Sequence, residues 1–216
     1  MNASSDLCKL YTSIKRRLWR FKIIFNSILF GIEYQSRINV SYLIIETDNL
    51  IKSAAREFIV STLLGTRTRN RMRTKTAVSL NSHGEVYAYI LSVLNSKKFI
   101  NANLPKTISL YETPTIRSGH DIHKVLAASC ASNIDSLNNA LALNFNFFDD
   151  VPTLRNFYAH RNSDTFSKVR RKSLNWGIGR ILHADDLVLS RRPGRPVSVF
   201  EDWLTEVDIF FDVLTS

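Results

Sequence analysis

The chain has 216 residues, 44% of them apolar, and its 29 lysines and arginines outweigh its 19 aspartates and glutamates to give a net charge of +10. This length is enough for one well-buried core, and no Gly-, Pro- or Ser-rich linker divides the sequence, so we expect a single domain over residues 1–216. Seven glycines and five prolines are few for a turn-rich β-sandwich. We therefore predict an all-α fold.

Several sequence features argue against export, membrane insertion and metal binding. The apolar stretch Phe21–Ile32 is interrupted by Lys22 and Asn26 and is too short to span a bilayer. Glu33, Tyr34 and Gln35 follow it, where a signal peptide would need a small-residue cleavage site. Cys8 and Cys130 are far apart and have no neighbouring metal ligands, so we interpret them as reduced thiols. We expect a cytoplasmic protein with no membrane association, no metal and no cofactor.

Apolar residues at helical spacing predict six helices, and caps and breakers set their limits. Between the third and fourth helices, residues 99–119 are predicted to form a loop or a short strand pair. The first predicted helix follows caps at Ser4–Asp6 and ends near Tyr34. The next three cover Val40–Leu64, which Gly65 closes, His83–Asn95 and Asp121–Leu143. The fifth, the motif helix, begins at a cap of Asp149 and Asp150 with Pro152 in its first turn, and the sixth covers Phe200–Leu214.

The most informative stretch is residues 154–162, Leu-Arg-Asn-Phe-Tyr-Ala-His-Arg-Asn. In a helix, Asn156 and His160 share a face and Arg155 lies about 100° from Asn156, so a guanidinium and an imidazole can border one cavity. Histidine is the natural acid or base near neutral pH, and arginine supplies a fork of donors that matches phosphate oxygens. Asn156 is suited to hold the imidazole tautomer or to contact a phosphate. These residue types suit metal-independent RNA cleavage.

A simpler interpretation stays open, because an arginine five residues before a histidine often arises by chance in a basic chain. In that interpretation Arg155 and His160 are only the polar side of an amphipathic helix, and Leu154, Phe157 and Tyr158 form its apolar side.

The stretch resembles the Arg-x4-His motif of HEPN-domain proteins, which carry a polar residue after the arginine. The resemblance implies an all-α bundle with a late motif helix and a C-terminal helix. It also implies a ribonuclease of toxin–antitoxin or antiviral defence systems. The early family helix that often carries an acidic residue resembles residues 42–60, where Glu57 or alternatively Glu46 takes that place. One toxin branch of the family has a tyrosine two residues after the histidine, where this chain has Asn162.

One chain offers one Arg155 and one His160, whereas cleavage requires both an acid and a base. A twofold-symmetric dimer that brings two motif helices together would supply two of each, and such dimers are the commonest oligomers. HEPN nucleases typically use that arrangement. We therefore expect a homodimer.

Two groups of cations are candidate RNA contacts. One group alternates with Thr, Asn and Met before the third helix, which predicts either an extended strand that follows a phosphate backbone or a solvated loop. The other group surrounds or follows the motif and is the better candidate for steering RNA. The groups are Arg67, Arg69, Arg71 and Arg73, with Lys75 after them, and Arg161, Lys168, Arg170, Arg171 and Lys172.

The sequence supports two functions of different classes. The first is an RNA endonuclease acting as a toxin or antiviral effector, with Arg155, His160, Asn156 and Glu57 at the site and an antitoxin or activating partner. The second is a non-catalytic HEPN-like module that binds RNA, a nucleotide or a protein partner. A DNA-binding regulator ranks last, because no recognition helix with its preceding short turn is visible.

Overall fold

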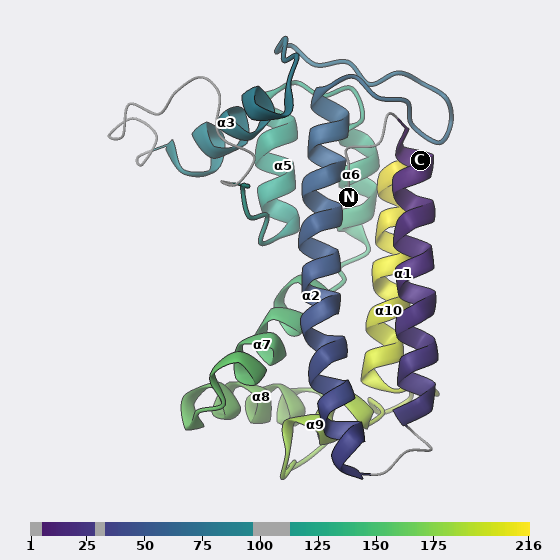
Figure 1. The fold of residues 1–216 in the computed structure, drawn as a ribbon, viewed down its shortest axis with the longest axis vertical. Coiled ribbons are helices and arrows are strands. Elements are labelled where there is room, and N and C mark those ends of the chain that lie inside the picture. The colour runs from purple at the N-terminus through teal and green to yellow at the C-terminus, as the bar shows by residue number, and fades with distance from the viewer. Residues whose placement is uncertain (1–5, 29–32, 97–112) are drawn as a thin grey trace. The chain divides into compact units, whose positions relative to one another are not determined.

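The computed structural model describes residues 6–28, 33–96 and 113–216, and within them the fold is all-α, which confirms the predicted fold class (Figure 1). In these ranges β-pairing is limited to isolated bridges such as Arg67 with Arg73. Most of the predicted region 99–119 lies outside the described residues. The helices are α1 (Leu7–Ile28), α2 (Glu33–Leu63), α3 (His83–Leu94), α5 (Gly119–Ala128), α6 (Ile134–Ala142), α7 (Phe147–His160), α8 (Ser163–Asn175), α9 (Ala184–Leu189) and α10 (Val199–Thr215).

The chain groups into two compact units that are each built from separate segments. Unit 1 comprises Met1–Ile14, Lys52–Asn144 and Phe210–Ser216, and unit 2 comprises Lys15–Ile51 and Phe145–Ile209. Helices α1, α2 and α10 each contribute residues to both units. The single domain expected from the sequence stays a prediction.

In unit 1, short helices pack around fully buried apolar residues. Helix α3 packs against α5, and α5 packs against α6. Phe58, Val86, Val125, Leu137 and Phe211 are completely buried, and each such side chain contributes roughly 1.5–3 kcal/mol of burial free energy. Helix α3 begins at His83 as predicted, and the Ser82 hydroxyl caps it by accepting a hydrogen bond from the Glu85 amide at 3.3 Å.

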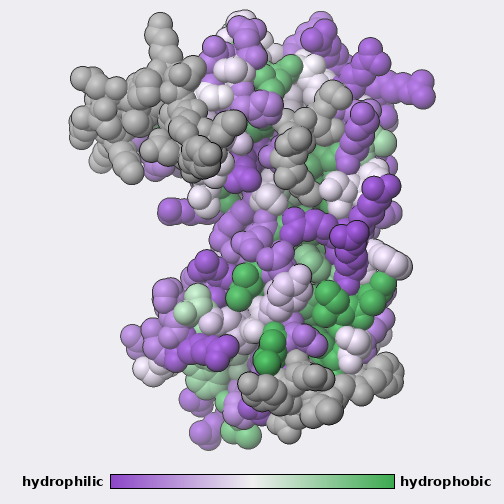
Figure 2. Space-filling view, in the orientation of Figure 1, coloured by the Kyte–Doolittle hydropathy of each residue, from purple (hydrophilic) through white to green (hydrophobic). Residues whose placement is uncertain are grey.

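Unit 2 has an aromatic core and an exposed apolar strip. The Phe25 and Phe200 rings lie 4.9 Å apart and both side chains are fully buried. On the outside of the same two helices, Trp19, Ile23 and Ile209 remain exposed, Trp19 by 65%. Figure 2 shows hydrophobic side chains gathered over the lower parts of α1 and α10 on a surface that is otherwise mostly hydrophilic.

Two predicted helix boundaries are wrong in the first half of the chain. The first helix was expected to reach about Tyr34, but α1 ends at Ile28 among the described residues, and α2 begins at Glu33 rather than near Val40. Gly31 stands between the two helices and is the sequence signal for the change of helix, which the prediction from apolar spacing did not use. The end of α2 agrees with the prediction, because Gly65 takes a positive φ of 74° directly after it.

The predicted helix Asp121–Leu143 is also wrong, because it divides into α5 and α6. Cys130 takes a positive φ of 49° between them. The backbone of this break is held by the segment that precedes α3: Ala77 donates to the Ser129 carbonyl at 2.8 Å and Ser132 donates to the Lys75 carbonyl at 2.9 Å. Hydrogen bonds to a distant segment thus replace helical ones at Ser129–Asn133, where the serines, the cysteine and the asparagine have low helix propensity.

The motif helix begins earlier than the acidic pair suggested. Helix α7 starts at Phe147 with Asn146 as N-cap, so Asp149 and Asp150 lie in its first turn and Pro152 lies inside the helix. The cap assigned to the two aspartates is therefore wrong. Phe147 is fully buried, and its burial extends the helix by most of a turn. Helices α8 and α9 were not predicted, whereas α10 matches the predicted C-terminal helix closely.

Candidate functional site

The motif lies at the end of α7, directly before a sharp turn into α8. His160 is the last residue of α7, and only Arg161 and Asn162 connect it to Ser163 at the start of α8. Arg161 takes left-handed backbone angles of φ 46° and ψ 39°, and the Asn162 side chain accepts a hydrogen bond from the Thr165 amide at 2.9 Å as the N-cap of α8. The two helices pack against each other as a hairpin (Figure 1). The Asn162 that stands in place of a tyrosine is thus explained locally as a cap.

The three polar motif residues share the outward arc of α7. The inward arc is formed by residues such as Phe147, Val151 and Leu154, which are all fully buried. Asn156 and His160 are exposed, and the Arg155 side chain is 40% exposed. The arginine and histidine therefore lie on one accessible surface, and neither is buried away from solvent.

A carboxylate that the sequence analysis did not single out lies beside Arg155. The Asp48 side chain on α2 is only 3% exposed, and its Oδ2 lies 3.8 Å from Nε of Arg155. Asp48 stands four residues after Ile44 and three before Ile51, at the spacing of the buried apolar face of α2. A charge at a core position needs a partner, and this pattern was the available signal.

The two acidic residues expected at the site have other surroundings. Glu46 pairs with Arg17 at 3.1 Å and also accepts a hydrogen bond from Asn49 at 3.1 Å. Glu57 belongs to unit 1, whereas the motif belongs to unit 2. Burial raises the pKa of the Glu57 carboxyl, against the opposing charges of Arg56 and His83. Asp48 is the acidic residue that the structure pairs with Arg155.

A cavity of about 580 Å³ lies at the junction of α7 and α8. It is lined by the beginning of α2, the end of α7 and the beginnings of α8 and α9, all within unit 2. Phe157, Tyr158 and Arg161 of α7 face it, whereas Arg155, Asn156 and His160 are not part of its lining. The expectation that the guanidinium and imidazole border one cavity is not met by this cavity and stays a prediction.

One polar pair in the cavity wall is partly buried. The Tyr158 hydroxyl donates a short hydrogen bond to Oδ1 of Asp185. Burial raises the pKa of the Asp185 carboxyl, and the hydrogen bond from Tyr158 and the charge of Arg37 oppose that rise. Burial and the Asp185 charge together raise the pKa of Tyr158. The phenol thus keeps its proton and the carboxylate faces the cavity as an acceptor.

Lys172, which was expected to contact RNA, is held by a buried ion cluster. Its Nζ lies 2.5 Å from Oδ1 of Asp150, a carboxylate that is only 3% exposed. Arg192 approaches the other oxygen of Asp150 at 3.6 Å and Glu206 at 3.6 Å. The Arg192 guanidinium also lies over the Trp176 ring, 4.4 Å from its centroid. We therefore leave Lys172 out of the proposed RNA surface, because its charge is already compensated inside unit 2.

The other cations of α8 differ in exposure. Lys168 and Arg171 are exposed and three residues apart, so they share the outward face of the helix, whereas Arg170 is half-buried on another face. Arg161 is exposed at the hairpin turn. Arg161, Lys168 and Arg171 are the cations of this region that are best placed to meet an anion.

The arginine-rich segment before α3 forms a tight hairpin, which differs from both the extended strand and the solvated loop that were predicted. Thr68 donates to the Met72 carbonyl at 2.8 Å and Thr74 donates to the Thr66 carbonyl at 2.8 Å. These bonds place Arg67 and Arg73 directly opposite each other, and both side chains are exposed, as are those of Arg71 and Lys75. The alternation places threonines inward and cations outward.

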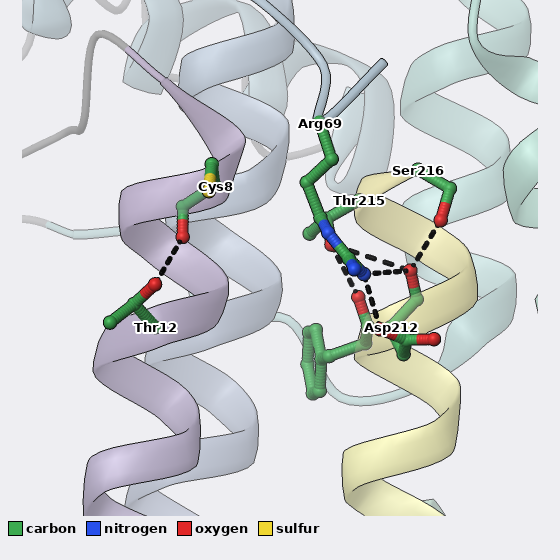
Figure 3. A network of polar contacts seen from close by, with 7 residues as sticks. Cys8, Thr12, Arg69, Asp212, Thr215 and Ser216 are labelled. Atoms are coloured by element: carbon green, nitrogen blue, oxygen red, sulfur yellow. Dashed lines mark hydrogen bonds and ion pairs between the residues drawn. The ribbon is translucent and has the colours of Figure 1, made fainter.

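Arg69 departs from this pattern. Its guanidinium pairs with the Asp212 carboxylate and donates to the Asp212 carbonyl at 3.2 Å (Figure 3). It also lies 4.5 Å from the centroid of the Tyr11 ring. Arg69 thus fastens the hairpin to the end of α10 within unit 1, and we do not include it among the proposed RNA contacts.

Neither a metal site nor a membrane span is found in the part of the chain that the structure describes. Its histidines, cysteines and carboxylates form no group of three that would hold a metal ion. None of its helices is long and apolar enough to cross a bilayer.

Comparison with known proteins identifies no relative. No protein-family model matches the chain, and neither a curated protein nor a solved structure matches it. The resemblance to HEPN domains therefore rests on residues 154–162 and on the helical fold, and its functional implications remain proposals.

Proposed function

We propose that this protein is a metal-independent RNA endonuclease of the HEPN type whose site is formed by Arg155, Asn156 and His160. The observation that carries the proposal is their common exposed arc at the end of α7, with Arg155 paired to the buried carboxylate of Asp48 at 3.8 Å. A buried anion restricts a long side chain that would otherwise sample many rotamers. Since the pairing uses Nε, the two Nη groups are left to bind phosphate oxygens.

The chemistry needs no group beyond these side chains. One imidazole removes the proton of a ribose 2′-hydroxyl, and the 2′-oxygen attacks the adjacent phosphorus. The bond to the 5′-oxygen then breaks as a second imidazole protonates that oxygen. The products are a 2′,3′-cyclic phosphate and a 5′-hydroxyl, and the Arg155 guanidinium stabilises the charge on the phosphorane oxygens.

The exposed position of the motif supports a homodimer as the active form. His160 is exposed and outside the cavity lining, so one chain supplies a single imidazole on an open surface. A second copy docked against the same arc would supply the missing acid or base and would exclude water from the site. The exposed cations Arg161, Lys168 and Arg171 would steer RNA toward it.

A non-catalytic RNA-binding module is the second candidate. The specific observation in its favour is that Arg155 and His160 lie outside the lining of the 580 Å³ cavity. In either case we propose a cytoplasmic toxin or antiviral effector that is restrained by an antitoxin or switched on by a defence partner, because an unrestrained ribonuclease would harm its own cell.

Incubation of total RNA with purified protein in EDTA, followed by end-group analysis, tests the proposal. Wild-type protein is expected to leave 2′,3′-cyclic phosphate ends, and His160→Ala is expected to leave the RNA intact. His120→Ala is the matched control, because His120 is an exposed histidine near a helix start in unit 1. Equal cleavage by wild type and His160→Ala, or no cleavage by wild-type dimer, would contradict the nuclease assignment.

A further inference from the structure

The 580 Å³ cavity beside the motif has the size and lining of a small-ligand site. Ligand pockets typically enclose about 300–1,000 Å³ and combine apolar walls with a few convergent polar groups. Here the helix ends of α2, α7, α8 and α9 meet within unit 2 around one space. Because helix ends bring side chains and unpaired backbone groups to the same place, such a junction is suited to a polar ligand.

One wall of the cavity is aromatic. The Phe157 and Phe166 rings both line it and lie 5.6 Å apart at 44° to each other. Both side chains are half-buried, so part of each ring remains open to the cavity. Nucleic acid bases stack on aromatic side chains in this kind of setting, at about 1–3 kcal/mol per base.

The lining also offers a carboxylate acceptor. Asp185 accepts the Tyr158 hydroxyl on Oδ1, and its remaining acceptor sites can receive donors from a ligand. A carboxylate recognises an edge with two adjacent N–H donors in a bidentate manner. Among the RNA bases, guanine presents such an edge through its N1–H and its exocyclic amine.

Positive charge also lines the cavity. The exposed side chains of Arg37 and Arg161 are part of the lining. The N-terminus of α8, a helix of 13 residues, opens onto the cavity at Ser163 and favours an anion there. Arg161 holds a left-handed backbone conformation that few residues other than glycine adopt. Such strain in a bulky residue is common at binding sites.

We propose that this cavity binds a guanosine phosphate, with the base stacked on Phe157 and Phe166, its N–H edge on Asp185 and its phosphate at Arg161 and Arg37. The same chemistry belongs to a guanosine within RNA and to a free guanine nucleotide. In the first case the cavity holds a guanosine of the substrate RNA, and this part rests on the proposed function.

Calorimetric titration of the full-length protein with GMP, IMP and AMP tests the site. GMP is expected to bind at least about tenfold tighter than AMP, with IMP between them because it keeps one of the two donors. Asp185→Asn is expected to remove at least about tenfold of the GMP affinity, whereas the matched Asp164→Asn, an exposed aspartate in the first turn of α8 outside the cavity lining, leaves it unchanged. Equal affinity for GMP and AMP would overturn the proposal.

Phe166→Leu provides a second variant in case Asp185→Asn fails to fold, as judged by thermal melting. It removes one aromatic face and is expected to weaken GMP and AMP alike, by at least about fivefold. Unchanged GMP affinity in a folded Phe166→Leu variant would contradict the stacking arrangement.

The source of the ligand is distinguished with non-cleavable 2′-O-methyl hexanucleotides that carry one guanosine or one adenosine among uridines. Tighter binding of the guanosine oligonucleotide to His160→Ala indicates a substrate base, whereas GMP binding without that preference indicates a free nucleotide. Both outcomes support the guanosine phosphate site. A protein that binds GMP but never cleaves RNA would retain this site and lose the proposed nuclease function.

Discussion

The two sides of α7 differ in how they are built. The motif side carries the exposed Asn156 and His160 and the half-buried Arg155, whereas the cavity side carries Phe157, Tyr158 and Arg161 into the wall of an open cavity. An exposed helix face forms a binding site only when a second molecule covers it, whereas a cavity already surrounds a ligand with side chains of the same chain. The proposed reacting groups and the proposed recognition groups thus alternate along one helix and occupy different faces of it.

The largest expected effect is on RNA cleavage, and it is expected to leave ligand binding in the cavity unchanged. His160→Ala removes a general acid or base and is expected to lower the RNA cleavage rate by about 10²–10⁴-fold, measured under single-turnover conditions. The same variant is expected to keep wild-type GMP affinity, because His160 is not part of the cavity lining. Loss of GMP affinity in His160→Ala would break the separation of the two sides.

The next effect probes how Arg155 is positioned. Asp48→Asn removes the buried charge beside Arg155 and is expected to lower kcat by up to about 10²-fold with a smaller change in KM, since misplaced groups lose mainly transition-state stabilisation. The pH–rate profile should keep its shape, because the imidazole is unchanged. Asp149→Asn, at an exposed aspartate of α7, is the control. Equal losses in both variants would contradict a positioning role for Asp48.

Titration of the buried ion cluster of Asp150, Lys172, Arg192 and Glu206 is expected to change the stability of the fold, and so to affect the motif side and the cavity side of α7 equally. Burial raises the pKa of Glu206 from 4.5 to about 7, so between those values the folded chain holds a proton that the unfolded chain has released. The free energy of unfolding is therefore expected to fall as pH rises from about 5 to 7, by no more than about 2 kcal/mol.

Urea denaturation at several pH values measures this dependence. Glu206→Gln should reduce the slope, and its gain in stability over wild type should be greatest at pH 8, where the wild-type carboxylate is charged in both states. A variant that retains the whole slope would assign it to other carboxyls, such as Asp150, whose pKa burial also raises.

The smallest effect sharpens the comparison at the residue that joins the two sides. Arg161→Gly relieves a left-handed conformation and is expected to stabilise the fold by about 1 kcal/mol in thermal or urea denaturation. The same variant is expected to bind GMP severalfold more weakly, because it lacks the guanidinium. A variant that is more stable yet binds less well excludes misfolding as the cause, whereas unchanged affinity would remove Arg161 from the proposed site.

Local signals in the sequence were sufficient for part of the fold. The end of α2 at Gly65 and the limits of α10 were predictable, because a glycine and amphipathic periodicity act within a few residues. The break at Cys130 was not predictable, since it depends on hydrogen bonds to residues 75 and 77, which are distant in sequence.

The candidate site was predictable to a similar degree. Exposure of Arg155 and His160 follows from the amphipathic pattern of α7, whereas the identity of the nearby carboxylate does not, because Asp48 lies more than a hundred residues away. The cavity was missed because its lining comes from four helices, and α8 and α9 were not predicted. Lys172 was misjudged because its buried partner Asp150 was assigned to a cap.

The short connection between α7 and α8 has a mechanical consequence. With only two residues between the helices, there is no slack to absorb a change of direction, and the four dihedral angles of Arg161 and Asn162 set the path of all 13 residues of α8. A rotation of 10° at that pivot moves a residue 15 Å along α8 by about 2.6 Å, roughly the reach of one hydrogen bond. The spacing between the cations of α8 and the imidazole of His160 therefore depends on the dihedral angles of two residues, one of which is Arg161 in a left-handed conformation.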